Sequence, residues 1–319
     1  MNAPLAATAA GALPQATLRA GTTPARAFLT LVRREFWEHR SLWMAPTVAA
    51  ALIALSALFG QVHLEASDID AMRAQQPELV RVAFFTIGQW LLAMPIYLVM
   101  ATVVTFYLLD CLYAERKDRS ILFWKSLPVS DAQTVLAKLV TGLVVVPLGS
   151  WLLALVSFLV FFGIWSVRVS LGYAPDLAHW GTLAWVRMEW ATLLAVLLAI
   201  LWYAPLAALL QLVSVLVRRA PMMWLTLALI GGVIAERILL GTHYLWGLIV
   251  YRSDGIWGLL AGGSAGMHID KHNLIPLDAW LLKLNFAGAF AAPALWLGVL
   301  AAAGLVALTV RIRRYRDDT

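Results

Sequence analysis

The 319-residue chain is 62% hydrophobic and only 13% charged, and it contains 15 tryptophans. A soluble protein of this size could not bury so much apolar surface, so the composition excludes an ordinary globular domain. The net charge of +6 would point to nucleic acid in a soluble protein, but here the basic residues lie between long apolar stretches. We therefore expect an all-α, polytopic membrane protein with no nucleic-acid partner.

Residues 1–22 form an Ala-, Gly-, Pro- and Thr-rich tract with no basic region before an apolar core. This composition predicts a disordered cytoplasmic tail rather than a cleaved signal peptide. Thr23 and Pro24 then provide an N-cap and a first helical position. They predict an amphipathic helix over residues 24–40 that lies along the inner membrane surface.

The predicted interfacial helix carries Arg33, Arg34, Glu35 and Phe36. These side chains could bind anionic lipid headgroups or a protein partner, and the sequence alone leaves both open.

Six apolar stretches with almost no internal charge follow. A bilayer core of about 30 Å requires ~20 residues of helix at 1.5 Å each, and every stretch meets or approaches that length. They make residues 23–319 a single transmembrane domain. The predicted spans are 42–61, 84–109, 139–165, 190–217, 222–240 and 286–310.

The basic residues predict the orientation. With six spans, eight of the 24 Lys and Arg residues face the side opposite the termini, and the other sixteen lie on the terminal side. The positive-inside rule then places both termini in the cytoplasm of a bacterial-type inner membrane. The eight are Arg73, Arg81, Arg168, Arg187, Arg237, Arg252, Lys271 and Lys283.

The outer segment before the last span, 241–285, is apolar but rich in glycine between 241 and 266. Its glycines predict short helices that dip into the outer leaflet rather than another span. Further along, His268, Asp270 and His272 could hold a divalent ion if the segment were helical, but they make an incomplete site. We predict no metal site and no catalytic residues.

Glu236 and Arg237 are the charges that lie inside a predicted span. Neighbouring residues point about 100° apart on a helix, so they do not neutralise each other along one face. Arg237 can extend to the headgroups. Glu236 then needs an interior partner, so the pair is a candidate for a structural ion pair or for a contact in a transport pathway.

The loop between spans two and three is the richest in candidate functional residues. Acidic and basic residues alternate in it, apolar and aromatic side chains follow, and Ser130 with Gln133 predicts a capping box that starts the next helix. A short helix with aromatic side chains inside a polar rim is typical of a docking surface. The candidate docking residues are Glu115, Arg116, Asp118, Arg119, Phe123, Trp124, Leu127, Pro128 and Ser130.

The run from Ala114 to Ser130, AERKDRSILFWKSLPVS, followed by Lys138, resembles the signature of ABC type-2 transporter permeases. The interfacial helix, the six spans and the long outer segment extend this resemblance over nearly the whole chain. Many family members have Gly-Thr where this chain has Arg119-Ser120.

The resemblance implies a permease subunit of an ATP-driven transporter, with two permease copies and two cytosolic ATPases. The interfacial helix and the loop would receive the ATPases, which would carry ATP and Mg²⁺. The chain itself has no G-x-x-x-x-G-K-[ST] motif, so we expect no enzymatic activity and no bound cofactor of its own. We expect an exporter; the alternatives are an ATPase-independent secondary carrier or channel and, more remotely, a membrane scaffold or sensor.

Overall fold

The computed structural model describes residues 24–59, 77–120, 129–174, 182–260 and 284–315, and within these ranges it contains helices and no strands. The tail 1–22, predicted to be disordered, lies outside them. The main helices are α1 (Pro24–Glu38), α2 (Ser41–Phe59), α4 (Pro77–Asp110), α5 (Tyr113–Lys117), α7 (Asp131–Val140), α8 (Val146–Ser170), α9 (Thr182–Leu216), α10 (Pro221–Leu239), α11 (Tyr244–Leu260), α13 (Phe286–Ala291) and α14 (Pro293–Tyr315).

The prediction of six helices able to span a membrane is confirmed, because six helices of the described residues are long and apolar enough to cross a bilayer. The third span includes α7, α8 and the π-helical turn η1 (Thr141–Val145) between them. Several helices are longer than predicted. In particular, α9 begins at Thr182 rather than near residue 190, which brings Glu189 into the helix.

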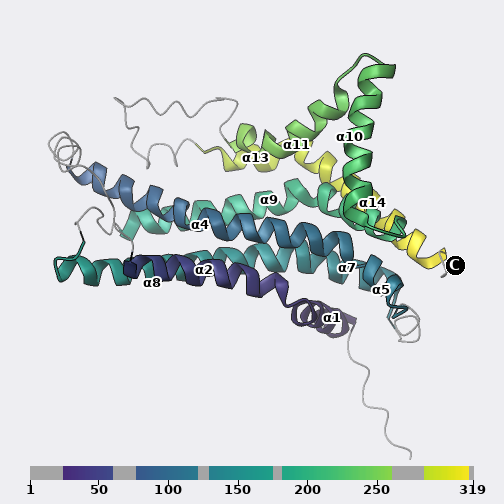
Figure 1. Cartoon of the computed structure of the whole chain (residues 1–319). Helices are drawn as coiled ribbons and strands as arrows, with labels where there is room; N and C mark the ends of the chain where they lie inside the picture. Colours follow the sequence, from purple (N-terminus) through teal and green to yellow (C-terminus); the bar gives the residue numbers. More distant parts are fainter. Residues whose placement is uncertain (1–23, 60–76, 121–128, 175–181, 261–283, 316–319) are drawn as a thin grey trace, which may run out of the picture.

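The long helices α2, α4, α8 and α9 lie side by side, and α14 packs along α9 (Figure 1). Small residues and branched aliphatic residues fill the contacts between α2, α4 and α8, including Ala50, Ile53, Ile96 and Ala154. A larger apolar cluster around Leu108, Leu112 and Val135 lies toward the end of the bundle where α1 and α5 are found. We call this end the α5 end.

The turn η1 has a local cause. Pro147 has no backbone N–H, so it cannot donate to the carbonyl one turn earlier, and such a gap favours a π-type turn next to it. Within the turn, Gly142 allows α4 to approach closely, since a Cβ there would lie 3.1 Å from the Leu108 side chain. The turn and its glycine therefore let this span pack closely against α4 near the α5 end.

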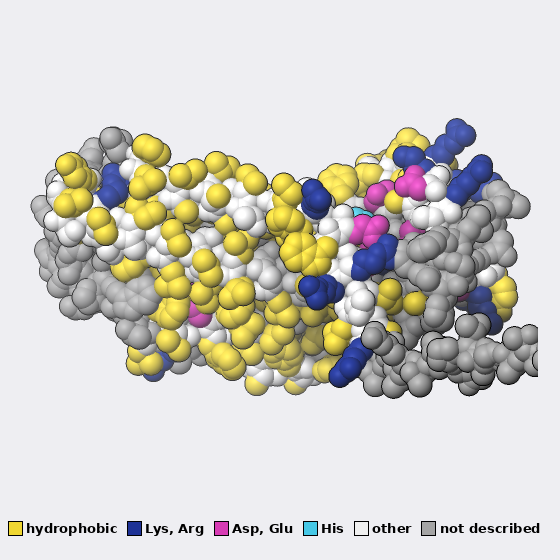
Figure 2. Space-filling view, turned by 90° about the horizontal axis from the view of Figure 1, so that it is seen from below, with side chains coloured by type: hydrophobic (Ala, Val, Ile, Leu, Met, Phe, Trp, Pro, Cys, Tyr) yellow, Lys and Arg dark blue, Asp and Glu magenta, His cyan; other side chains and the backbone are white. Residues whose placement is uncertain are grey.

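The surface separates into two zones (Figure 2). Hydrophobic side chains cover most of the visible face along the bundle, while Lys, Arg, Asp and Glu gather toward the α5 end. Many large apolar side chains are exposed along the spans, such as Leu52, Leu98 and Leu300. Such an exposed apolar face is suited to contact with lipid tails rather than with water.

The helix α11 differs from the prediction for the outer segment. It is one helix of 17 residues, so its three glycines do not divide it into shorter helices; contacts along its length hold it instead. Trp202 of α9 donates from Nε1 to the Arg252 carbonyl (3.0 Å), and the Arg252 guanidinium lies 4.5 Å from the centre of the Trp202 ring. The predicted outer-segment residues 261–283 lie outside the described ranges.

Candidate functional site: a buried charge network at the α5 end

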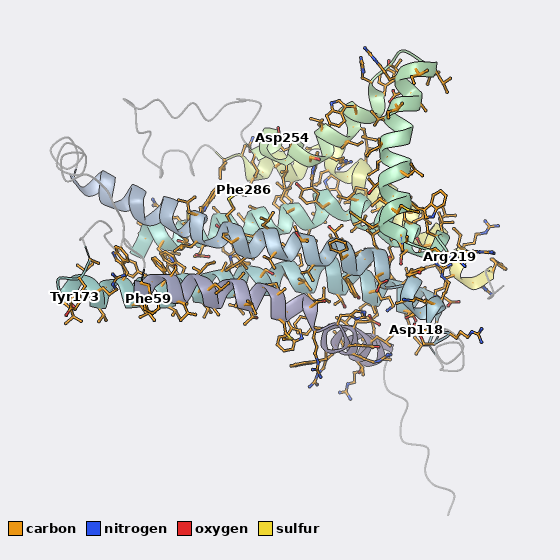
Figure 3. The ribbon with its side chains drawn as sticks, viewed as in Figure 1. Phe59, Asp118, Tyr173, Arg219, Asp254 and Phe286 are labelled. Carbon is orange, nitrogen blue, oxygen red and sulfur yellow. The ribbon has the colours of Figure 1, made fainter. Side chains whose placement is uncertain are left out.

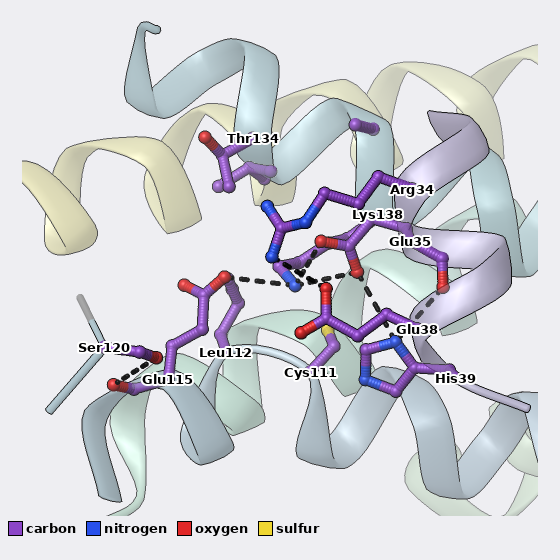
Figure 4. A network of polar contacts seen from close by, with 12 residues as sticks. Arg34, Glu35, Glu38, His39, Cys111, Leu112, Glu115, Ser120, Thr134 and Lys138 are labelled. Carbon is purple, nitrogen blue, oxygen red and sulfur yellow. Dashed lines mark hydrogen bonds and ion pairs between the residues drawn. The ribbon is translucent and has the colours of Figure 1, made fainter. Parts of the chain in front are cut away.

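Charged side chains from four separate helices meet at the α5 end. Glu35 comes from α1, Glu115 from α5, Lys138 from α7 and Arg313 from α14, and all four are buried. Figure 4 shows Glu35, Glu115 and Lys138 converging between their helices. Burying a charge without a partner is costly, so each of these four side chains is expected to have a partner of opposite charge.

Lys138 lies at the centre of the network. Its Nζ donates to both carboxylate oxygens of Glu35 at 2.9 Å, and it lies 3.1 Å from Oε1 of Glu115. The Tyr107 hydroxyl donates to Oε2 of Glu35 (3.2 Å). The Lys138 ammonium group of α7 therefore links α7 to α1 and α5. The Tyr107 hydroxyl, through Glu35, links α4 to the same network.

Arg313 continues the network into the last helix. Its Nη1 lies 2.8 Å from Oε2 of Glu115, and its Nε donates to Oδ1 of Asp131 at 3.1 Å. The Lys138, Glu115 and Arg313 side chains are at most 9% exposed, whereas that of Asp131 is 26% exposed. Cations and carboxylates thus alternate from α1 to the start of α7, which compensates each buried charge.

Two further contacts fix α5 to α9. The Ser214 hydroxyl accepts from the backbone N–H of Leu112 (3.1 Å) and of Tyr113 (3.0 Å), and Ser214 is fully buried. Arg116 donates from Nη2 to the carbonyls of Ser214 (2.6 Å) and Val217 (2.8 Å) at the end of α9. A guanidinium placed there satisfies carbonyls that have no partner within the helix.

The loop residues predicted to form a docking surface divide into two groups. Glu115 and Arg116 point inward, as described above, whereas Asp118 and Arg119 are exposed beside the exposed Lys117. Ser130 caps α7: its hydroxyl accepts from the Gln133 N–H and the Gln133 side chain accepts from the Ser130 N–H, so the predicted capping box is present. Phe123, Trp124, Leu127 and Pro128 lie outside the described residues.

The backbone of Arg119 adopts a left-handed conformation, with φ at +56°. This region favours glycine, because a Cβ is strained there.

On α1, the residues predicted as a docking surface are likewise split. Arg33 is exposed, and Arg34 pairs with Glu38 on the surface (2.7 Å). Phe36 instead packs against the apolar cluster, and Glu35 belongs to the buried network. The inward placement of Glu35 and Glu115 could not be predicted from the helical pattern, because their partners Lys138 and Arg313 lie far away in the chain.

Glu236 and Arg237 contact the turn after their own helix. Glu236 accepts from the Thr242 hydroxyl (2.7 Å) and from the N–H groups of Tyr244 (2.6 Å) and Leu245 (2.8 Å) at the start of α11. Arg237 donates to His243. The partners of Glu236 are therefore hydroxyl and backbone donors that join α10 to α11, and the structure gives it no ion pair with a residue of another described helix.

Among the described residues, no group of three or more His, Cys, Asp or Glu side chains could hold a metal ion. The candidates His268, Asp270 and His272 lie outside those residues. No protein-family model matches the chain, and no curated protein or solved structure matches it significantly.

Proposed function

We propose that this chain is the membrane-spanning permease subunit of an ATP-driven exporter of the ABC type-2 class. The motif from Ala114 to Ser130 suggests the class, and the position of α5 carries the proposal. This short helix follows α4 and ends at Lys117, which is exposed together with Asp118 and Arg119 just after it, while Glu115 and Arg116 on its inner side bind α7, α14 and α9.

A power stroke from a partner needs a rigid connection to the spans. A force on α5 passes through Glu115 to Lys138 and Arg313, and through Arg116 to the end of α9. The Glu115 contacts are buried, the Arg116 contacts are partly buried, and all of them are charge-assisted, so they resist separation better than exposed surface pairs. The α5 end is then the cytoplasmic end, in agreement with the positive-inside rule, and both termini lie in the cytoplasm.

The proposed partners are cytosolic ATPase subunits and a second permease copy. The ATPases would bind the exposed residues of α5 and α1, an interfacial helix in this proposal. The second copy would complete a transport pathway with two-fold symmetry. The span α10 suits such a contact, because it is the least buried of the six candidate spans and exposes Trp224, Leu227 and Ile230.

The test is affinity purification of the full-length chain from its own membranes. We expect a soluble ATPase to copurify, and the charge swap Asp118→Lys with Arg119→Glu to reduce its recovery severalfold, because rim charges set the register of an interface. Asp254→Lys, an exposed reversal on α11, serves as the control and should leave recovery unchanged.

The second candidate is a secondary carrier or channel. It is favoured by the buried carboxylate of Glu189 inside a candidate span, because such groups are common in ion-coupled carriers. Uptake or release of cargo by proteoliposomes that contain the chain alone, without ATPase and ATP, would establish this alternative and exclude the first.

A further inference from the structure

The outward face of α1 carries positive charge that no described residue neutralises. Arg26 and Arg33 are seven positions apart, so they lie on the same side of the helix, and both are exposed. Neither guanidinium has a hydrogen bond or an ion pair with a described residue, whereas Arg34 pairs with Glu38 at 2.7 Å. Arg40, in the turn that follows α1, is likewise exposed and has no acidic partner among the described residues.

Two apolar side chains complete this face of α1. Leu29 lies between the two arginines and is 65% exposed, and Trp37 lies one turn beyond Arg33 and is 57% exposed. The opposite side of the helix is bound to the bundle through the buried Glu35. We call Arg26, Leu29, Arg33 and Trp37 the α1 stripe, and it contains no acidic residue.

The connection to the first span holds α1 at a membrane interface. The helix α2 has 19 residues, about 28 Å at 1.5 Å each, so it needs nearly its whole length to cross a bilayer core of about 30 Å. Its first residue, Ser41, therefore lies at the interface, and α1 ends only three positions earlier, at Glu38. Figure 1 shows α1 nearly end-on where α2 runs along the bundle, so α1 lies across the span rather than continuing it.

The aromatic residues at this junction agree with that depth. The ring of Trp37 packs edge-on against the ring of Trp43 on α2, with 5.9 Å between the ring centres. Tryptophan is enriched at the level of the lipid headgroups, where its indole meets both apolar and polar groups. The α1 stripe therefore lies beside the headgroup layer of the leaflet at the α5 end.

The composition of the α1 stripe selects its partner. Unpaired arginines beside a leucine and a tryptophan suit a surface that has negative charge next to apolar chains. A guanidinium also binds phosphate oxygens through parallel N–H donors. The exposed end of α5 differs, because Lys117 and Arg119 there flank the acidic Asp118. Mixed charge of that kind suits the rim of a protein interface better than an anionic lipid.

We propose that the α1 stripe binds anionic phospholipid, with Arg26 and Arg33 at the lipid phosphates and the two apolar side chains between the headgroups. This assignment leaves the side of α1 that carries the Arg34–Glu38 pair for the ATPase of the proposed function. The lipid contact itself does not depend on that function, because it requires only that α1 lie at a membrane interface.

The experiment measures the preference for anionic lipid at α1 in nanodiscs of phosphatidylcholine. A bimane fluorophore is attached to the full-length Cys111→Ala chain at Thr30→Cys, an exposed position beside the stripe. Quenching is compared between phosphatidylglycerol and phosphatidylcholine that carry the same nitroxide near the start of one acyl chain. We expect phosphatidylglycerol to bind there about tenfold or more in preference to phosphatidylcholine, since each basic residue near a membrane surface contributes about fivefold.

Charge variants show which residues cause the preference. Arg26→Gln with Arg33→Gln should bring the binding of the two lipids to within about twofold of each other. Arg26→Lys with Arg33→Lys should keep most of the preference, because the charge remains. Lys117→Gln with Arg119→Gln removes two exposed positive charges from the α5 end and should leave the preference unchanged. All these positions are exposed, so each variant should unfold as the reference chain does.

Three results would overturn the proposal. The first is equal quenching by the two lipids in the reference chain. The second is an equal loss of preference in the two glutamine double variants, which would assign the preference to net charge. The third is no quenching by either lipid, which would place the stripe in water or against another protein. The nanodiscs contain no ATPase, so each result is independent of the copurification that tests the proposed function.

Discussion

Lys138 donates from Nζ to both carboxylate oxygens of Glu35 at 2.9 Å, although the two residues are 103 positions apart in the chain. Glu35 lies on α1, before the first span, and Lys138 on α7, where the third span begins. This pair attaches α1 to the bundle. Through Glu115 it also connects α1 to α5 and α14.

The first prediction concerns Lys138. Lys138→Met removes the central cation and leaves the buried Glu35 carboxylate with the Tyr107 hydroxyl and the His39 ring (3.7 Å) as its neighbours, so the protein should lose about 3 kcal/mol or more of unfolding free energy. The measurement is chemical or thermal unfolding in detergent. Lys117→Met, at an exposed position of α5, should change stability by less than about 0.5 kcal/mol.

Adding Glu35→Gln to Lys138→Met should restore part of the loss, because it removes the uncompensated charge. Strictly additive effects of the two substitutions would mean that the pair is not coupled.

The second prediction concerns Ser214. Ser214→Ala removes the acceptor of two backbone N–H groups, those of Leu112 and Tyr113. Two buried donors without partners should cost about 2 kcal/mol or more. Ser253→Ala is the matched control, since Ser253 is exposed and donates only to the Ile249 carbonyl of its own helix. Equal effects of both changes on unfolding would show that the α5–α9 contact is not formed.

The third prediction concerns Arg119. Arg119→Gly should leave stability unchanged or raise it by about 0.5–1 kcal/mol, because glycine adopts positive φ without strain. Lys117→Gly, in the last turn of α5, should instead destabilise the protein, because glycine lowers helix propensity. A clear loss of stability in Arg119→Gly would mean that the turn does not adopt the left-handed conformation.

Much of the fold could be predicted from the sequence, because a span needs only length and apolar composition, and these are local properties. The capping box at Ser130 and Gln133 was predictable for the same reason. The ends of the helices were harder: α9 continues to Thr182 past charged residues, since Glu189 finds Gln89 on another helix.

The candidate site was predicted less well, for a physical reason. An alternation of acids and bases, as in residues 115–119, indicates a solvated surface when it is read along the chain. Whether a given carboxylate is exposed depends on which distant helix brings a cation, and Glu115 meets Lys138 and Arg313, whereas Asp118 is exposed. Such pairings depend on tertiary structure that no local pattern encodes.

The fourth prediction concerns topology and uses the single cysteine. Cys111 is buried, so the native thiol should not react with a membrane-impermeant reagent in intact cells. In a Cys111→Ala background, Tyr173→Cys should be labelled in intact cells, whereas Lys117→Cys should be labelled only after permeabilisation. Both residues are exposed, and Figure 3 shows that Tyr173 and Asp118, the neighbour of Lys117, lie at opposite ends of the bundle.

The fifth prediction tests the central claim, that α5 receives a cytosolic ATPase. A photoactivatable amino acid is placed at Asp118, and, as a control, at Tyr173 at the opposite end of the bundle (Figure 3). After irradiation of intact cells, the chain substituted at position 118 should be crosslinked to a polypeptide that carries a G-x-x-x-x-G-K-[ST] motif, and the chain substituted at position 173 should not. The contrary result is a crosslinked ATPase at position 173 with none at position 118, which would place any ATPase at the wrong end of the molecule.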